Sequence, residues 1–327
     1  MSKVSDVTER SSFYTHEHIF TSLICLIREP PLIVVLSFTT LVGVPGNALV
    51  LWVTGVKMKW TMTTIWFWNL AVADIICCLS LPFTIVQFFY PDWLYGPVLC
   101  KMLHFIVPLN MFTSVFTLVA ISVDRCILVV QPIWARNHRG VRTAWMTCLA
   151  IWTLSSVMCL PVVQYQHFDT SDNRTECNSA SPITELTTYI NMVFGFLIPF
   201  LIISTCYISV AFILHNRRFT EIGNKIIKVS LGIIVAFFIT WAPYHIMGVI
   251  LIYIQSDVVG ILDLFTQSLA MFNSCINPIL YVFMGKDMKD KVRHSIAELI
   301  QNTLTESLSK TPPERSQQIG EDNVPIQ

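Results

Sequence analysis

The chain has 327 residues, of which 54% are hydrophobic and only 13% are charged, and its 21 basic residues balance its 21 acidic residues. A soluble domain carries about a quarter charged residues. This composition, together with a mean hydropathy of +0.60, therefore indicates a membrane protein and excludes an ordinary soluble domain.

Seven apolar segments are each long enough to cross a bilayer, which requires roughly 20 helical residues. They cover approximately residues 32–56, 63–90, 98–130, 141–163, 186–214, 226–254 and 261–284. Lipid cannot satisfy backbone polar groups, so each segment is expected to be a helix. The sequence predicts an all-α membrane protein with one seven-transmembrane helix bundle over residues 32–284.

The flanking segments predict the orientation of the bundle. Most Lys and Arg residues fall on the side that also holds the C-terminus, so residues 1–31 are expected to be extracellular. Their first 18 residues are polar, and we expect no signal peptide. The apolar stretch Ile19–Ile27, which holds Cys25, is too short to span. It either lies along the membrane surface or folds over the helix ends.

Two further segments follow the seventh span. Residues 285–301 place apolar side chains at helical spacing opposite basic ones, which predicts a short amphipathic helix on the cytoplasmic membrane surface. Residues 302–327 are rich in Ser, Thr, Pro and Gln and predict a disordered cytoplasmic tail.

Two motifs lie at the ends of apolar segments. Asp-Arg-Cys at residues 124–126 ends near the inner edge of the third segment, and Asn-Pro-Ile-Leu-Tyr at residues 277–281 closes the seventh. Charged residues are costly in a membrane, so the Asp124–Arg125 pair is a functional hypothesis. The alternative is an arginine whose long side chain simply reaches the interface.

Two features lie deeper in the spans. Asp74, within Asn-Leu-Ala-Val-Ala-Asp at residues 69–74, would be a carboxylate near mid-membrane. Phe237, Trp241 and Pro243 combine an aromatic pair with a proline that removes a backbone hydrogen bond and kinks a helix. The alternative for the aromatic pair is ordinary core packing.

These motifs, over nearly the whole chain, resemble the rhodopsin-like (class A) G-protein-coupled receptors. The resemblance implies a receptor whose Arg125 is held at rest by Asp124 and turns to the G protein on activation. It also implies a set of switch residues, namely Asp124, Arg125, Tyr207, Phe237, Trp241, Pro243, Asn277, Pro278 and Tyr281.

The resemblance also implies an ion site, a disulfide bond and a modified asparagine. An allosteric sodium ion would be held around Asp74; the alternative is a water-filled polar network without an ion. No other cofactor is expected. Cys100 and Cys177 would form a disulfide bond, and Asn173 starts a glycosylation sequon in the same outer loop. The residues implied around the ion are Asp74, Asn110, Ser114, Asn273 and Asn277, with Asn47 and Ser274 beside them.

Within the superfamily the chain resembles the chemoattractant group, and most of all the anaphylatoxin receptors for complement fragment 3a. Val107 replaces the aspartate of amine receptors, and Met271 replaces the retinal-linking lysine of opsins. Asp263 matches the acid that meets a ligand's terminal arginine; the alternative is a rim aspartate facing water. Gln166 and Asn191 stand where the group has arginines for the ligand's carboxylate. The expected pocket residues are His104, Val107, Pro108, Met111, Gln166, Asn191, Trp241, Tyr244, His245, Asp263 and Gln267.

The function that these features predict is a plasma-membrane receptor for an extracellular peptide or protein chemoattractant, signalling through a Gi-class G protein. Arrestin and receptor kinases are expected partners, whereas nucleic acid and enzymatic activity are not expected. Receptors for a lipid mediator, or for formyl-peptide or chemerin-type ligands, are the alternatives within the fold. A transporter would show inverted repeats, which we do not find. The candidate kinase sites are Thr303, Thr305, Ser307, Ser309, Thr311 and Ser316.

Overall fold

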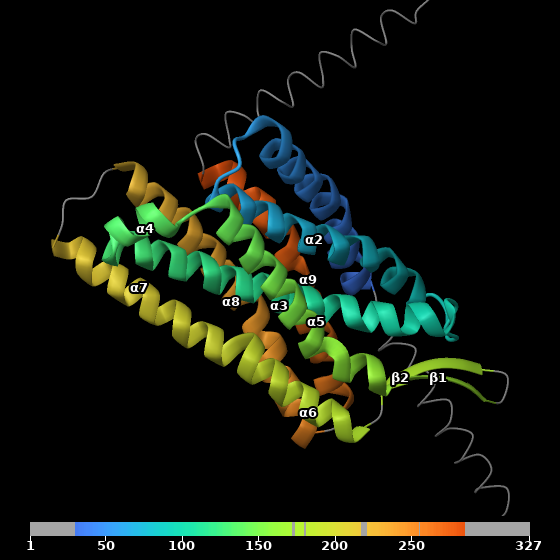
Figure 1. Ribbon diagram of the computed structural model, residues 1–327. Coiled ribbons are helices and arrows are strands. Elements are labelled where there is room, and N and C mark those ends of the chain that lie inside the picture. Colours follow the sequence, from blue (N-terminus) through green and yellow to red (C-terminus); the bar gives the residue numbers. More distant parts are fainter. Residues whose placement is uncertain (1–29, 172–173, 180, 217–220, 255, 285–327) are drawn as a thin grey trace, which may run out of the picture.

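Seven long apolar helices form the computed structural model of this chain (Figure 1). The structure describes residues 30–171, 174–179, 181–216, 221–254 and 256–284. All seven predicted spans are confirmed, with ends that differ by a few residues from the expected ones. The expected amphipathic helix at 285–301, the tail at 302–327 and the segment before residue 30 lie outside the described residues.

The helices follow one another along the bundle with short connections. The first spans Pro30–Lys57 and ends in the π-helical turn η1 (Val53–Lys57). The others are α2 (Met62–Gln87), α3 (Gly96–Val130), α5 (Val141–Tyr165), α6 (Ser181–Met192) continued by η2 (Val193–Leu197) and α7 (Ile198–Asn216), α8 (Glu221–Tyr253) and α9 (Asp257–Met284).

Two elements between the spans were not predicted from the sequence. A short helix, α4 (Pro132–His138), connects α3 to α5, and an antiparallel hairpin of β1 (Gln166–Ser171) and β2 (Arg174–Ser179) connects α5 to α6. Figure 1 shows the hairpin and α4 at opposite ends of the bundle, here called the hairpin end and the α4 end. The all-α prediction therefore needs one addition, the hairpin.

Local sequence accounts for where the helices begin and bend. Thr61 caps α2: its Oγ1 accepts from the backbone N–H of Thr64, whose hydroxyl accepts from the N–H of Thr61. Pro82, Pro108 and Pro243 lie inside α2, α3 and α8, where each removes a helical hydrogen bond.

Helix α3 is the centre of the fold and contacts α2, α5, α7 and α8. Buried polar side chains join it to its neighbours. Asn69 of α2 donates to Thr117 Oγ1 of α3 at 2.7 Å and accepts from Trp152 Nε1 of α5 at 2.8 Å. One asparagine therefore connects three helices.

Candidate functional site

A cavity of about 400 Å³ opens at the hairpin end of the bundle. Residues from α2, α3, α5, α6, α8 and α9, and one from the connection between α2 and α3, form its wall. They are Thr84, Gln87, Trp93, Leu103, His104, Val107, Pro108, Val162, Thr187, Thr188, Asn191, Trp241, Tyr244, Gln267, Ala270 and Met271. None of these described wall residues is Asp, Glu, Lys or Arg, so the wall is neutral and largely apolar, as ligand pockets commonly are.

Most residues expected in the pocket lie on this wall. His104, Val107, Pro108, Asn191, Trp241, Tyr244 and Gln267 do so, and Met111, Gln166, His245 and Asp263 do not. Gln166 is buried at the start of β1 and donates to Cys177 Sγ at 3.2 Å. His245 is buried with its ring 5.2 Å from that of Phe196, so it packs between helices rather than facing the cavity.

Asp263 lies next to the wall and contacts it through one neighbour. Gln267, one turn further along α9, donates from Nε2 to Asp263 Oδ2 at 2.6 Å. Asp263 is half-buried, so its second carboxylate oxygen can still meet a ligand group. This pair provides a carboxylate beside an otherwise neutral cavity.

The hairpin is fastened over this end of the bundle at two points. A disulfide joins Cys177 of β2 to Cys100 near the start of α3, which bears out the expected pair. Trp93 donates its backbone N–H to Thr175 O at 2.7 Å, and Thr175 Oγ1 donates back to Trp93 O at 2.9 Å. Because Trp93 is a wall residue, these bonds connect the hairpin directly to the cavity.

The floor of the cavity is Trp241, which stacks on Phe237 with ring centroids 5.8 Å apart. Both side chains are buried, and Pro243 follows in the same helix. Met111 packs closely against Gly195 of η2. A Cβ added to Gly195 would lie only 2.7 Å from Met111 Cε. The expected aromatic and proline set is thus placed between the cavity and the centre of the bundle.

A polar cluster lies deeper, around the fully buried Asp74. Asn277 donates from Nδ2 to Asp74 Oδ2 at 2.8 Å, Asn110 donates to Ser274 Oγ at 3.0 Å, and Ser114 donates to Asn110 Oδ1 at 3.4 Å. Several buried side-chain oxygens in this cluster meet no donor within hydrogen-bond geometry among the described residues. They are Asn47 Oδ1, Asp74 Oδ1, Asn273 Oδ1 and Asn277 Oδ1. Oxygen donors around one carboxylate fit a hard cation such as sodium.

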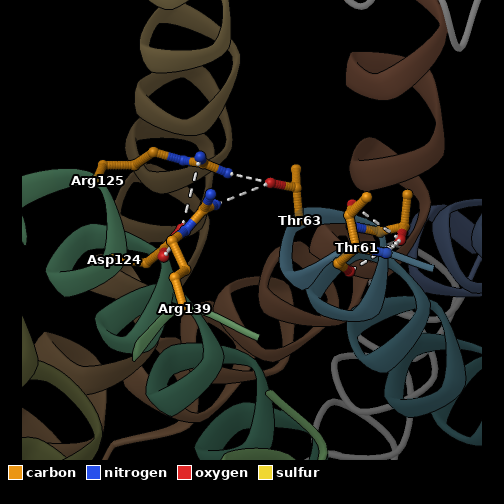
Figure 2. Close-up of polar contacts among 6 residues, drawn as sticks. Thr61, Thr63, Asp124, Arg125 and Arg139 are labelled. Atoms are coloured by element: carbon orange, nitrogen blue, oxygen red, sulfur yellow. Dashed lines mark hydrogen bonds and ion pairs between the residues drawn. The ribbon is translucent and has the colours of Figure 1, made fainter. Parts of the chain in front are cut away.

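The Asp124–Arg125 pair lies at the α4 end, where both residues are 5% exposed. Figure 2 shows Arg125 reaching toward Thr63 of α2, whose Oγ1 accepts from Nη2 at 2.9 Å. Arg125 Nη1 is 3.5 Å from Asp124 Oδ2. A second arginine, Arg139 at the end of α4, also binds Asp124. Tyr207 of α7 lies near Arg125.

Two expected residues cannot be placed with their side chains. The side chain of Tyr281, although its backbone belongs to α9, and the whole of Asn173 lie outside the described residues. Pro278 lies inside α9 beside Asn277, and its ring packs closely against Gly46 of the first helix. A Cβ added to Gly46 would lie 3.1 Å from that ring.

Several residues of the site were not found from the sequence. The wall residues Thr187, Thr188, Ala270 and Met271 recur at helical spacing with Asn191 and Gln267, and this periodicity was an available signal. Trp93 and Arg139 carried no such signal, because both belong to connections between spans whose path the sequence pattern does not predict.

Comparison with known proteins agrees with this architecture. Residues 46–281 match the family described as 7 transmembrane receptor (rhodopsin family). The C3a anaphylatoxin chemotactic receptor of Oncorhynchus mykiss is 40% identical over 295 residues, covering 85% of this chain and 80% of the relative. The C5a anaphylatoxin chemotactic receptor 1 of Oryctolagus cuniculus is 37% identical, covering 81% and 79%. Formyl peptide receptor 2 of Mus musculus is 35% identical, covering 85% and 86%.

These relatives are receptors rather than enzymes, and the matched region extends from the first helix to the last. It contains the cavity, the buried Asp74 cluster and the Asp124–Arg125 pair. The chain is a multi-pass membrane protein that belongs to the rhodopsin family of seven-transmembrane receptors.

Proposed function

We propose that this receptor binds an extracellular peptide or protein chemoattractant through a basic group and signals through a Gi-class G protein. The observation that carries the proposal is the half-buried Asp263, held by Gln267 beside a neutral cavity. A carboxylate in this position makes a charge-assisted hydrogen bond to an incoming guanidinium or ammonium group.

The relatives support the peptide class of ligand. Two of them are named for complement fragments, C3a and C5a, and a third for formyl peptides. A formyl-peptide-like ligand is the second candidate, favoured by the neutral, apolar inner wall of the cavity. An acidic lipid is disfavoured, because no Lys or Arg is among the described wall residues.

The signalling arrangement follows from the orientation that the basic residues predict. We propose that the receptor lies in the plasma membrane with the hairpin end outside and the α4 end in the cytoplasm. A ligand in the cavity that binds more tightly to the conformation whose α4 end is open shifts the receptor population toward that conformation. Arg125 would then turn to the G protein, and phosphorylation of the C-terminal tail by receptor kinases would recruit arrestin.

The test is Gi activation in transfected cells exposed to complement fragments 3a and 5a, each with and without its C-terminal arginine. Asp263→Asn is expected to lower the potency of the intact fragment about tenfold or more, because it removes a charged hydrogen-bond partner. Asp257→Asn is the matched control, since Asp257 is an exposed acid in the first turn of the same helix.

Each result has a clear meaning when surface expression is equal. Loss of the response on removing the arginine or on changing Asp263, with Asp257→Asn unaffected, supports recognition of a basic terminus. Silence toward both fragments overturns the anaphylatoxin assignment, and the same cells exposed to formyl peptides then test the second candidate.

A further inference from the structure

Asp124 has a closer partner than the arginine beside it in the sequence. Arg139 donates from Nε to Asp124 Oδ1 at 2.5 Å and from Nη2 to Oδ2 at 3.0 Å, whereas Arg125 Nη1 lies 3.5 Å from Oδ2. Arg139 thus makes the two-point contact that fits a guanidinium to a carboxylate, and Arg125 makes a longer, single-point contact (Figure 2).

The two arginines also share a second acceptor. Thr63 Oγ1 accepts from Arg125 Nη2 at 2.9 Å and lies 3.4 Å from Arg139 Nη2. The group of Thr63, Asp124, Arg125 and Arg139 therefore holds two cations on one carboxylate and one hydroxyl. It carries one positive charge in excess, so the two guanidinium groups repel each other across Asp124.

The net charge of this group changes when the Arg125 side chain moves away from it. The Asp124 side chain is only 3% exposed, and a buried carboxylate without a partner is strongly unfavourable. With Arg139 in place, Asp124 keeps both short contacts after Arg125 has gone, and the remaining pair is neutral. Without Arg139, Arg125 would be the only cation described at this carboxylate, and its departure would leave a buried, unpaired charge.

We propose that Arg139 is a positioning residue for the switch: by binding Asp124 in place of Arg125, it lowers the free-energy cost of releasing Arg125. The inference rests on the proposed role of Arg125 as the group that turns to the G protein. It assigns to the connection between α3 and α5 a direct part in activation, through one side chain at the end of α4.

The test combines single and double variants of the full chain in lipid nanodiscs without agonist. Spin labels at position 142 of α5 and position 228 of α8 report how far the α4 end is open, and nucleotide exchange on purified Gi, Gs and Gq heterotrimers reports coupling. The variants are Arg139→Gln, Arg139→Lys, Asp124→Asn and the double variant Asp124→Asn with Arg139→Gln. Arg136→Gln is the matched control, because Arg136 is an exposed arginine of the same short helix.

We expect Arg139→Gln to reduce the open fraction and the basal exchange on the order of tenfold, within the usual range of coupling between sites. Arg139→Lys should fall in between, because an ammonium group cannot reproduce the two-point contact. Asp124→Asn should raise the open fraction. The double variant should match Asp124→Asn alone, because Arg139 matters only while Asp124 is charged.

Two results would overturn the proposal. A higher open fraction in Arg139→Gln would mean that Arg139 restrains the switch. An equal loss from Arg139→Gln with and without Asp124→Asn would mean that Arg139 only supports the local fold. If the parent receptor couples to no heterotrimer, the proposed signalling function fails, and the label distances alone then decide the role of Arg139.

Discussion

Asp74 is fully buried at the centre of the bundle, and one of its oxygens accepts from Asn277 at 2.8 Å. Its other oxygen and the side-chain oxygens of Asn47, Asn273 and Asn277 meet no donor within hydrogen-bond geometry among the described residues. Such oxygens are costly to bury without a hydrogen bond or a cation. The cluster therefore couples the first, second, third and seventh spans through a site that suits a small hard cation.

We expect sodium to act on this receptor through Asp74. Replacing potassium by sodium at constant ionic strength should lower agonist potency severalfold, and Asp74→Asn should remove that difference, because the amide carries no charge for the ion. The measurement is displacement of a labelled agonist fragment from membranes in the two salts. Equal sodium sensitivity in Asp74→Asn would contradict the proposed ion site.

At the scale of the helices, the hydrogen bonds of a single buried side chain join three of them. Asn69 joins α2 to Thr117 of α3 and Trp152 of α5, and it is 2% exposed. Without it, a partly buried indole N–H and a buried hydroxyl would each lose a partner. A buried group left without its hydrogen bond costs about 1–3 kcal/mol.

Asn69→Ala is therefore expected to lower the free energy of unfolding by about 2 kcal/mol or more and to reduce the melting temperature of the purified receptor. Thr153→Ala is the control, since exposed Thr153 donates only to Leu149 O within the same helix. Thermal unfolding followed with a thiol-reactive dye distinguishes the two. Equal melting temperatures for both variants would show that Asn69 does not align the three helices.

At the scale of the whole molecule, the hairpin is coupled to the bundle at Cys100–Cys177 and at Trp93–Thr175. The two cysteines are separated by 77 residues in the sequence. Closing so long a loop by a covalent bond restricts the unfolded chain considerably. The disulfide bond therefore contributes to stability as well as to the position of the cavity's outer wall.

Replacing both cysteines by serine should cost roughly 2–4 kcal/mol of stability and should weaken binding of an agonist fragment at the hairpin end. Melting temperature and fragment binding on surface-expressed receptor check the two effects. The parent receptor treated with a reductant should approach the variant in both measurements. Unchanged binding in the variant would show that the Trp93–Thr175 bonds alone hold the hairpin in place.

Much of this molecule was predictable from residue type and spacing. Seven apolar runs predict seven helices because a bilayer leaves the backbone no other solution, and the motifs around Asp74, Arg125, Trp241 and Asn277 mark the polar interior. The sequence by itself thus determined the number of spans and the family, and it named seven of the sixteen residues that line the cavity.

Only the tertiary structure decided which side chains share a space. His245 lies one residue from the wall residue Tyr244 yet packs on Phe196, because successive helix positions point about 100° apart and the bundle sets the rotation of each helix. The partnership of Arg139 with Asp124, 15 residues apart, depends on how the α3–α5 connection folds back as α4. Apolar periodicity specifies which segments enter the membrane, whereas contacts between helices and their connections depend on packing that no single segment encodes.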